Sequence, residues 1–261
     1  GYYYIAFRYR QPNKTDFPVF CDIKIDGAIP NELLQAYPFD YTRSYKNLTL
    51  KDRDKEPVAV YLAEGEHTLS ITINSDNIRH VLEAVDRLMN EINDLALEVT
   101  KVAGTNKDKY RDLKLSKYIP DVQERIYGWV DELYALENSV KQYNPKAKEI
   151  GAFSSIRVAA ARLADLAEDP DEIPYRINEL AQSSNSAVQY LANLVDGLNK
   201  NDLALDKIFI YQKDAKLPKG PGFFKSIYLS VARFFSSFSD QSYSTANVNR
   251  EHLQVWVNRP R

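Results

Sequence analysis

"HTLSITINSDNIRHVLEAVDRLMNEI" (His67–Ile92) contains the change of pattern that decides the fold. Up to Asn74, apolar and polar residues alternate, which is the period of a half-buried strand. From Ser75 onward, apolar residues recur every three or four positions, which is the period of a helix with one buried face. We therefore expect a β region to end near Asn74 and a helical region to follow it.

Residues 1–74 have the pattern of a β domain. Several short strands with no helices between them indicate an antiparallel sandwich or jelly roll. The last two expected strands are joined by "AEGE", a length and composition that suit a hairpin loop. Because five strands are few for such a fold, we expect this sandwich to be partial, with earlier strands before residue 1. The expected strands are Tyr2–Arg10, Val19–Asp26, Tyr45–Leu50, Val58–Leu62 and His67–Asn74.

Residues 75–200 predict an antiparallel bundle of helices joined by short linkers. The first helix should end at Gly104, a residue suited to the left-handed position after a helix. Trp129 falls between Ile126 and Leu133 in the apolar seam of the second helix, so we expect it in the core. The expected helices are 75–102; 117–143, with Pro120 in its first turn; 154–167; and a fourth that runs to about Leu198, with Asp171 as its N-cap.

The remaining residues predict three further segments. "LDKIFIYQ" (205–212) alternates like a strand or an extended brace, and residues 222–238 form an amphipathic helix pattern. Basic residues near that helix would suit a membrane surface, but its polar face is mostly serine, which favours docking onto protein. A polar linker and a last strand pattern, "LQVWV" (253–257), follow. The predicted class is α+β: a partial antiparallel β-sandwich (1–74), a helical bundle (75–200), a brace with a docking helix (201–238), and a linker with an orphan strand that opens a further domain (239–261).

The composition excludes several classes of function. The 261 residues carry a net charge of −2, so no nucleic-acid footprint is present. The sequence contains no run of 18 apolar residues, so it predicts no membrane-spanning helix. Cys21 is the one cysteine, and its strand pattern predicts a buried thiol. Without phosphate-binding, zinc-protease or EF-hand motifs, and with three histidines in separate segments, we predict no enzyme, no metal and no cofactor.

One aromatic segment stands out as a candidate binding site. "AYPFDYTRSY" (36–45) places Tyr37, Phe39, Tyr41 and Tyr45 between strands of the expected sandwich. Aromatic rings of this kind pack against the apolar faces of sugars, and neighbouring polar groups bind the hydroxyls. The alternative is that the segment crosses one end of the sandwich and plugs its core. Tyr41 and Tyr45 are the better candidates, since the Pro38-Phe39 step favours a buried plug.

Several phrases together resemble a known family. "TDFPVFCDIKIDGAIP", "VYLAEGEHTLSITIN", "YGWVDEL" and "LQVWVNRPR" resemble the front half of large extracellular solute-binding lipoproteins of carbohydrate-type ABC importers from Gram-positive bacteria. The resemblance implies a carbohydrate-module-like sandwich, a helical region, and then a two-lobed receptor domain that opens with "LQVWV". The chain departs from a complete receptor, because it has no lipid-anchor cysteine motif and Cys21 sits within a strand pattern.

The resemblance implies a non-catalytic accessory region that contacts glycan or the cell envelope and positions the receptor domain. Its implied partners are an oligo- or polysaccharide and, through the receptor domain, an ABC permease. Its implied place is outside the cell, anchored by a lipid beyond this stretch. Two alternatives are a purely structural or protein-interaction spacer without sugar affinity and a hydrolase fragment, and the lack of catalytic motifs disfavours the latter.

Overall fold

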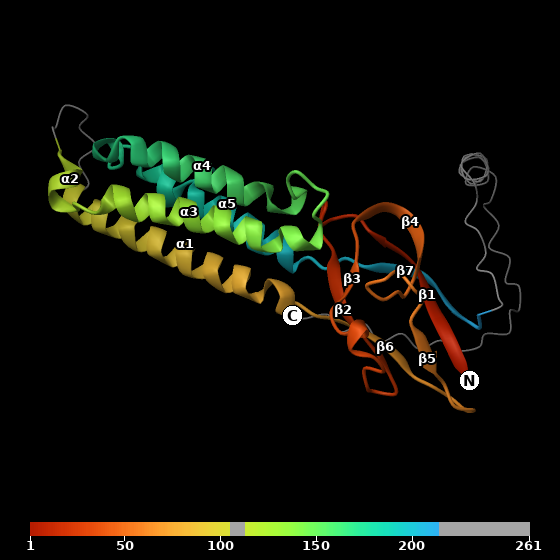
Figure 1. Cartoon of the computed structure of the whole chain (residues 1–261). Helices are drawn as coiled ribbons and strands as arrows, with labels where there is room; N and C mark the ends of the chain where they lie inside the picture. The colour runs from red at the N-terminus through yellow and green to blue at the C-terminus, as the bar shows by residue number, and fades with distance from the viewer. Residues whose placement is uncertain (105–112, 214–261) are drawn as a thin grey trace, which may run out of the picture. The chain divides into compact units, whose positions relative to one another are not determined.

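A computed structural model describes residues 1–104 and 113–213 of the chain (Figure 1). In these ranges two antiparallel sheets and a set of long helices give an α+β fold, as predicted. Strand β6 (Leu69–Ile73) and helix α1 (Asp76–Ala103) flank residues 74–75, which confirms the predicted break. The predictions for the helix at 222–238, the linker at 239–249 and the strand at 253–257 lie outside the described residues.

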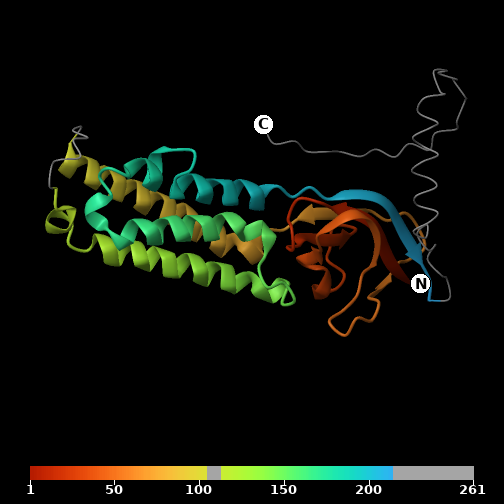
Figure 2. The same ribbon diagram turned by 90° about the horizontal axis from the view of Figure 1, so that it is seen from above.

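The first sheet is built around β1 (Tyr2–Gln11). Strands β4 (Thr42–Thr49) and β5 (Ala59–Tyr61) share one edge of β1, because they pair with its second half and its first residues respectively. Strand β7 (Ala204–Tyr211) pairs with Tyr4–Arg10 on the other edge. The strand expected at 205–212 is therefore confirmed, and α5 leads into it (Figure 2).

In the second sheet, β2 (Val19–Ile25) lies between β3 (Tyr37–Phe39) and β6. The predicted hairpin of residues 58–62 with 67–74 is wrong, since β5 belongs to the first sheet and β6 to the second. An isolated two-stranded hairpin is marginally stable, and each strand instead pairs with the central strand of a sheet. Strand β3 was expected as a loop; its Pro38 is tolerated because β3 is an edge strand.

The two sheets enclose a core whose buried strand residues come from β1, β2, β3 and β5, and β4 and β6 add partly buried side chains. Cys21 lies in it with its side chain fully covered, as predicted, and burial raises the pKa of the thiol to about 12. Of the described strands, β3 and β7 are additions to the five expected in residues 1–74. The buried residues of this core are Ile5, Phe7, Tyr9, Val19, Cys21, Ile23, Leu34, Tyr37, Phe39, Leu50, Val58, Val60 and Leu62.

Helices α1, α3 (Val122–Val140), α4 (Ser154–Glu168) and α5 (Ala187–Asn199) form the bundle, each antiparallel to the one before it (Figures 1 and 2). Each helix contacts two of the others, in the cyclic order α1, α3, α4, α5. Helix α1 ends at Gly104 with φ of +67°, as predicted. Trp129 is 6% exposed and belongs to the bundle core, as predicted. Among the described residues, no helix combines the length and apolar character needed to cross a membrane.

The second predicted helix, 117–143, is broken in the structure. A short helix, α2 (Leu115–Tyr118), ends before Pro120, and α3 begins only at Val122. Proline removes a backbone donor and pushes the residue before it out of the helical region. Ile119 accordingly has φ of −128° and ψ of 79°.

The fourth predicted helix does not start at Asp171. Pro170–Glu172 is a 3₁₀ turn, Asn178–Gln182 is a π-helical segment, and α5 starts at Ala187 with Ser186 as its N-cap. The Asp171 carboxylate instead accepts hydrogen bonds from the backbone N and the Oγ of Ser116, both at 3.0 Å. It caps α2, a helix from an earlier part of the chain, and is not available to the helix that follows it.

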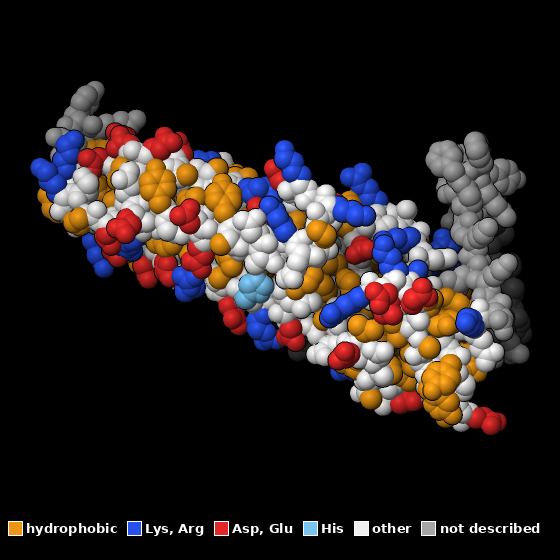
Figure 3. Space-filling model, in the orientation of Figure 1, with side chains coloured by type: hydrophobic (Ala, Val, Ile, Leu, Met, Phe, Trp, Pro, Cys, Tyr) orange, Lys and Arg blue, Asp and Glu red, His pale blue; other side chains and the backbone are white. Residues whose placement is uncertain are grey.

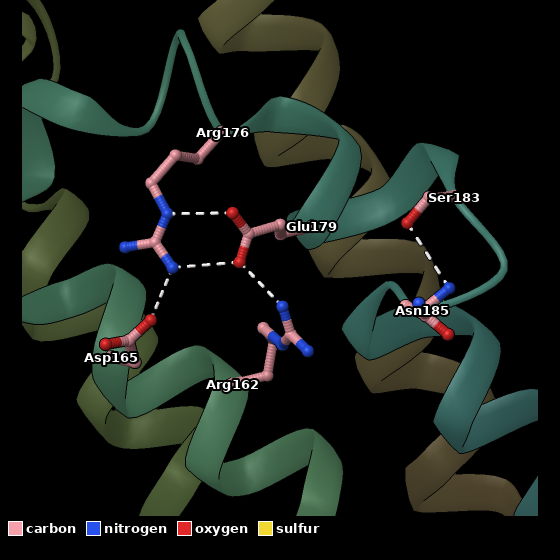
Figure 4. Close-up of polar contacts among 6 residues, drawn as sticks. All are labelled: Arg162, Asp165, Arg176, Glu179, Ser183 and Asn185. Carbon is pink, nitrogen blue, oxygen red and sulfur yellow. Dashed lines mark hydrogen bonds and ion pairs between the residues drawn. The ribbon is translucent and has the colours of Figure 1, made fainter.

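A cluster of ion pairs holds the irregular turn between α4 and α5 (Figure 4). Arg176 donates through Nε and Nη2 to the two carboxylate oxygens of Glu179, at 2.9 and 2.8 Å. Arg162 donates to the same carboxylate at 2.6 Å, and Arg176 also contacts Asp165. Arg176 and then Arg162 lower the pKa of Glu179 to about 2, despite the opposing effect of burial.

The sandwich and the bundle are joined by an aromatic cluster and by backbone contacts, and both belong to one compact unit, Gly1–Lys216. Phe17 and Phe20 belong to the bundle core, where their rings lie 5.3 Å from Phe153 and 4.8 Å from Tyr143 respectively. The amide of Ala152 donates to the Thr15 carbonyl at 2.8 Å. This junction brings the loop between α3 and α4 against the β1–β2 loop.

Candidate functional site

Burial separates the four aromatic candidates into two pairs. Tyr37 and Phe39 lie in β3 and are 7% and 0% exposed. The Tyr37 hydroxyl accepts a hydrogen bond from the backbone N of Lys51 at 3.0 Å, and burial raises its pKa. Tyr41 is half-buried and Tyr45 is 42% exposed. The structure thus places Tyr37 and Phe39 where the core-plug alternative expected them.

Phe39 is the centre of an aromatic cluster inside the sandwich. Its ring centroid lies 5.7 Å from that of Phe7, 5.1 Å from that of Tyr9 and 6.0 Å from that of Tyr37. The Tyr9 side chain is fully buried, and its hydroxyl donates to the Asp40 carbonyl at 3.1 Å. A ligand cannot stack on Phe39 without opening this core, so the surface candidates are Tyr41 and Tyr45.

Tyr41 lines an open cavity of about 360 Å³ at the junction of the sandwich and the bundle. The cavity combines aromatic rings with carboxylate, ammonium and amide groups. The sandwich contributes Asp16, Phe17, Pro18, Asp40, Tyr41 and Lys46, and the bundle contributes Tyr143, Asn144, Pro145 and Lys146.

Polar contacts fix the groups around this cavity. Arg43 donates through Nε to the Tyr41 hydroxyl at 2.9 Å, and this hydrogen bond lowers the pKa of Tyr41. The Lys46 ammonium lies 3.8 Å from the Asp40 carboxylate and 5.3 Å from the ring centre of Tyr9. The cavity therefore presents a phenol whose position is set by a guanidinium, beside a carboxylate–ammonium pair.

Asp16 is held in place from the bundle side. It has φ of +60°, a left-handed conformation that aspartate tolerates better than most residues. Its carbonyl accepts a hydrogen bond from Nδ2 of Asn144 at 3.0 Å. Gly151 packs so closely against the neighbouring Thr15 that an added Cβ would lie 2.7 Å from Thr15 Cγ2.

The lining of the cavity suits the binding of a polar organic ligand. This lining places hydrogen-bond donors and acceptors around an aromatic surface, which is typical of a site that binds such a ligand. No cysteine, serine or histidine lines it. Within the described residues, no group of three or more His, Cys, Asp or Glu side chains is placed to hold a metal ion.

Tyr45 lies in different surroundings from Tyr41. It projects from β4 onto the outer face of the first sheet, where the guanidinium carbons of Arg8 and Arg10 lie 5.8 and 5.6 Å from its ring centre. Arg8 also pairs with Asp206 of β7, with Nε 3.1 Å from Oδ2. The structure thus does not combine the predicted aromatic residues into one site.

Sequence reasoning missed Asp16, Asn144 and Lys146 as neighbours of Tyr41. Asn144, Pro145 and Lys146 follow the helix predicted at 117–143, and their residue types alone do not mark a binding site. No local signal connects positions 16, 41 and 144, because they meet only when the α3–α4 loop packs on the sandwich.

The helices that complete this cavity can be compared with known families. Residues 80–198 match the family model described as "Bacterial solute-binding protein, 4-helix bundle domain". This region is therefore similar to the helical-bundle domain of bacterial solute-binding proteins. Comparisons with curated proteins and with solved structures gave no match.

The matched bundle domain begins within α1 and ends within α5, so it includes the loop that carries Tyr143, Asn144, Pro145 and Lys146. The sandwich residues that line the cavity lie outside the match. The candidate site is therefore formed where the bundle domain meets a second module of the same chain.

Proposed function

We propose that this chain is a non-catalytic accessory region of an extracellular bacterial solute-binding protein that serves carbohydrate import. In this proposal the sandwich contacts glycan and the bundle positions a receptor domain. The observation that carries the proposal is the Tyr41 cavity, which lies at the boundary between the sandwich and the matched bundle domain.

The chemistry of the cavity supports a sugar ligand. A sugar ring offers apolar C–H faces and a rim of hydroxyl groups, so its site needs an aromatic surface with donors and acceptors beside it. Tyr41 and Tyr143 supply aromatic surface, and Asp40, Lys46 and Asn144 supply polar groups.

The attachment of the bundle supports a positioning role. Strand β6 passes into α1 across two residues, and α5 returns to β7 across four. At that return, Nζ of Lys14 donates to Oδ1 of Asn201 at 2.5 Å, and Asn13 contacts Asp202. With the α3–α4 loop docked on Thr15 and Asp16, the bundle is held at three places. A spacer with such an attachment would transmit orientation as well as distance.

The family resemblance and the bundle match support three further parts of the proposal: a receptor domain, an ABC permease as partner, and a lipid anchor. The receptor domain would follow this region and deliver solute to an ABC permease. A lipid anchor and a place outside the cytoplasmic membrane belong to the same proposal.

A spacer without sugar affinity is the second candidate. The burial of Tyr37 and Phe39 favours it, because two of the four aromatic candidates serve the core and not a ligand. The two candidates differ in one property, which is the affinity of the chain for glycans.

Calorimetric titration of the chain with xylan, glucan and pectin fragments separates the two candidates. We expect the wild type to bind at least one of them and Tyr41→Ala to lose about tenfold in affinity, since one sugar-stacking ring buries an area worth about 1–2 kcal/mol. Tyr127→Ala, which removes an exposed tyrosine on α3, is the control and should bind like the wild type.

Each outcome decides a different point. A wild type that binds none of the three glycans would leave only the spacer function. Binding that survives Tyr41→Ala unchanged would remove the junction cavity from the proposal.

A further inference from the structure

The outer face of the first sheet carries an ordered row of side chains along β1. Successive residues of a strand point to opposite faces. Ile5, Phe7 and Tyr9 are buried between the sheets. The residues of the other parity therefore point outward, and they are Tyr2, Tyr4, Ala6, Arg8 and Arg10.

Tyrosines of the neighbouring strands extend the first half of this row. Tyr61 of β5 pairs with Tyr2, and their ring centroids lie 5.4 Å apart. Tyr211 of β7 pairs with Tyr4, and their ring centroids lie 5.8 Å apart. The Tyr211 hydroxyl lies 3.1 Å from Oγ1 of Thr49. Tyr2 and Tyr61 are 70% and 62% exposed, so their rings are accessible.

The second half of the row is basic. Lys207 of β7 pairs with Arg8 and is exposed, and Tyr45 lies under the guanidiniums of Arg8 and Arg10. The carboxylate of Asp206 forms an ion pair with Arg8. Among the described side chains of this half, three cations thus face one carboxylate. We call the whole surface the outer tyrosine face; it comprises Tyr2, Tyr4, Arg8, Arg10, Tyr45, Tyr61, Lys207 and Tyr211.

The composition of this face favours a glycan over a protein partner. The half-exposed aliphatic side chains of β7, Leu205, Ile208 and Ile210, pair with inward residues of β1 and so belong to the opposite side of the sheet. The outward positions of the four strands hold rings, alanines and polar groups, without the larger aliphatic residues that fill a protein–protein core. Rings flanked by hydrogen-bonding groups suit the C–H faces and hydroxyls of a sugar chain.

We propose that the outer tyrosine face binds an acidic polysaccharide, with sugar rings on the Tyr2–Tyr61 and Tyr4–Tyr211 pairs and sugar carboxylates at Arg8 and Arg10. This inference rests on the glycan contact proposed above and adds a second surface of the sandwich with its own ligand class. From Tyr2 to Arg10 the strand rises about 26 Å, at about 3.3 Å per residue, which accommodates several linked sugar units. The Tyr41 cavity remains a separate glycan contact.

The test uses two ligands with the same sugar backbone, one anionic and one neutral. The complete 261-residue chain is titrated with oligogalacturonate and with its methyl-esterified, neutral form, at low and at physiological salt. We expect the acid form to bind at least tenfold more tightly, and its binding to weaken as salt rises, because exposed charges are screened over about 8–10 Å at physiological ionic strength.

Matched variants locate the ligand on the face. Tyr61→Ala should lower affinity for both forms about tenfold, whereas Tyr118→Ala, at a tyrosine with a similar exposure of 64%, should leave it unchanged. Arg10→Gln should weaken the acid form alone, and Arg79→Gln, in the exposed first turn of α1, should have no effect. Circular dichroism of each variant checks the fold.

The outcomes distinguish this inference from the proposed function. Equal affinity for the two ligands, or an unchanged affinity of Tyr61→Ala and Arg10→Gln for the acid form, would overturn the outer tyrosine face. Xylan or glucan binding that is lost in Tyr41→Ala, together with equal affinity for the acid and the neutral galacturonate, would keep the proposed function while removing this inference. A chain that binds no glycan of either panel would overturn both.

Discussion

Trp129 links α3 to α1 through its ring and its indole nitrogen. The ring is buried in the bundle core, and Nε1 donates to Oε2 of Glu91 at 2.8 Å. We predict that Trp129→Ala lowers the free energy of unfolding by about 3–5 kcal/mol, the range for truncating a buried aromatic residue. Urea unfolding followed by circular dichroism measures this. A midpoint equal to that of the wild type would contradict the bundle packing described here.

Glu179 gives the bundle a dependence on pH. Its folded-state pKa, about 2, lies below the value of about 4.3 for an unfolded glutamate, so the contribution of the carboxylate is complete above pH 4.3 and is lost as pH falls toward 2. The group is partly exposed, and we expect a contribution on the order of 1 kcal/mol.

The variant Glu179→Gln isolates this effect from the other carboxylates. It should be less stable than the wild type at pH 7, and the difference in unfolding free energy should shrink between pH 4.3 and 2. A difference that stays constant over this range would show that Arg176 and Arg162 do not act through the charge of Glu179.

The residue pattern predicted which of these side chains are buried, but not what they bind. Trp129 was correctly placed in the core from its spacing alone, and Cys21 from its strand. The hydrogen bond of Trp129 to Glu91 and the reach of Asp171 to Ser116 join residues 38 and 55 positions apart. Such pairs depend on how elements pack, which local periodicity does not encode.

Among the elements, the α3–α4 loop is the contact on which the junction depends. An alanine at Gly151 would place its Cβ 2.7 and 2.9 Å from Thr15 Cγ2 and Cβ. We predict that Gly151→Ala costs about 1–3 kcal/mol, the usual penalty for forcing atoms into a packed site. Chemical unfolding of the purified variant measures it.

Gly197→Ala is the matched control for this change. An added Cβ at Gly197 meets nothing within 4 Å, and the residue lies inside α5. Alanine is a better helix former than glycine by about 1 kcal/mol, so this variant should gain stability. Equal effects of the two substitutions would mean that the α3–α4 loop does not pack on Thr15.

The sequence predicted where most helices and strands lie along the chain better than it predicted which strands pair with each other. Hydrophobic period located β1, β2, β4, β5, β6, α1 and α4 to within a few residues. It could not show that β7 pairs with β1, since these strands lie about 200 positions apart. The apolar spacing also predicted helices that continue through Pro120 and through the polar run Ser183–Ser186. In the structure the helix is interrupted at both places, although the apolar spacing continues. Period alone also did not identify β3, the strand in which Tyr37 and Phe39 are buried.

At the scale of the molecule, the sandwich and the bundle should unfold together. Phe17 and Phe20 come from the sandwich sequence but lie in the bundle core, and β7 returns to the sandwich after the last helix. We predict one cooperative transition, as for a single two-state unit.

Two native probes report on the two parts. The buried Cys21 thiol reports on the sandwich through its rate of labelling, and Trp129 fluorescence reports on the bundle in a Trp256→Phe background. Their urea midpoints should coincide. Midpoints that differ clearly would show that the junction does not couple the sandwich to the bundle.

Affinity gel electrophoresis measures directly whether this chain binds glycan. The complete chain is run through native gels without polysaccharide and with pectin, xylan or glucan, beside a reference protein that binds none of them. We predict that its mobility falls in at least one polysaccharide gel, and most in the acidic one. Mobility equal to that of the reference protein in all three gels would show that the chain binds none of these glycans.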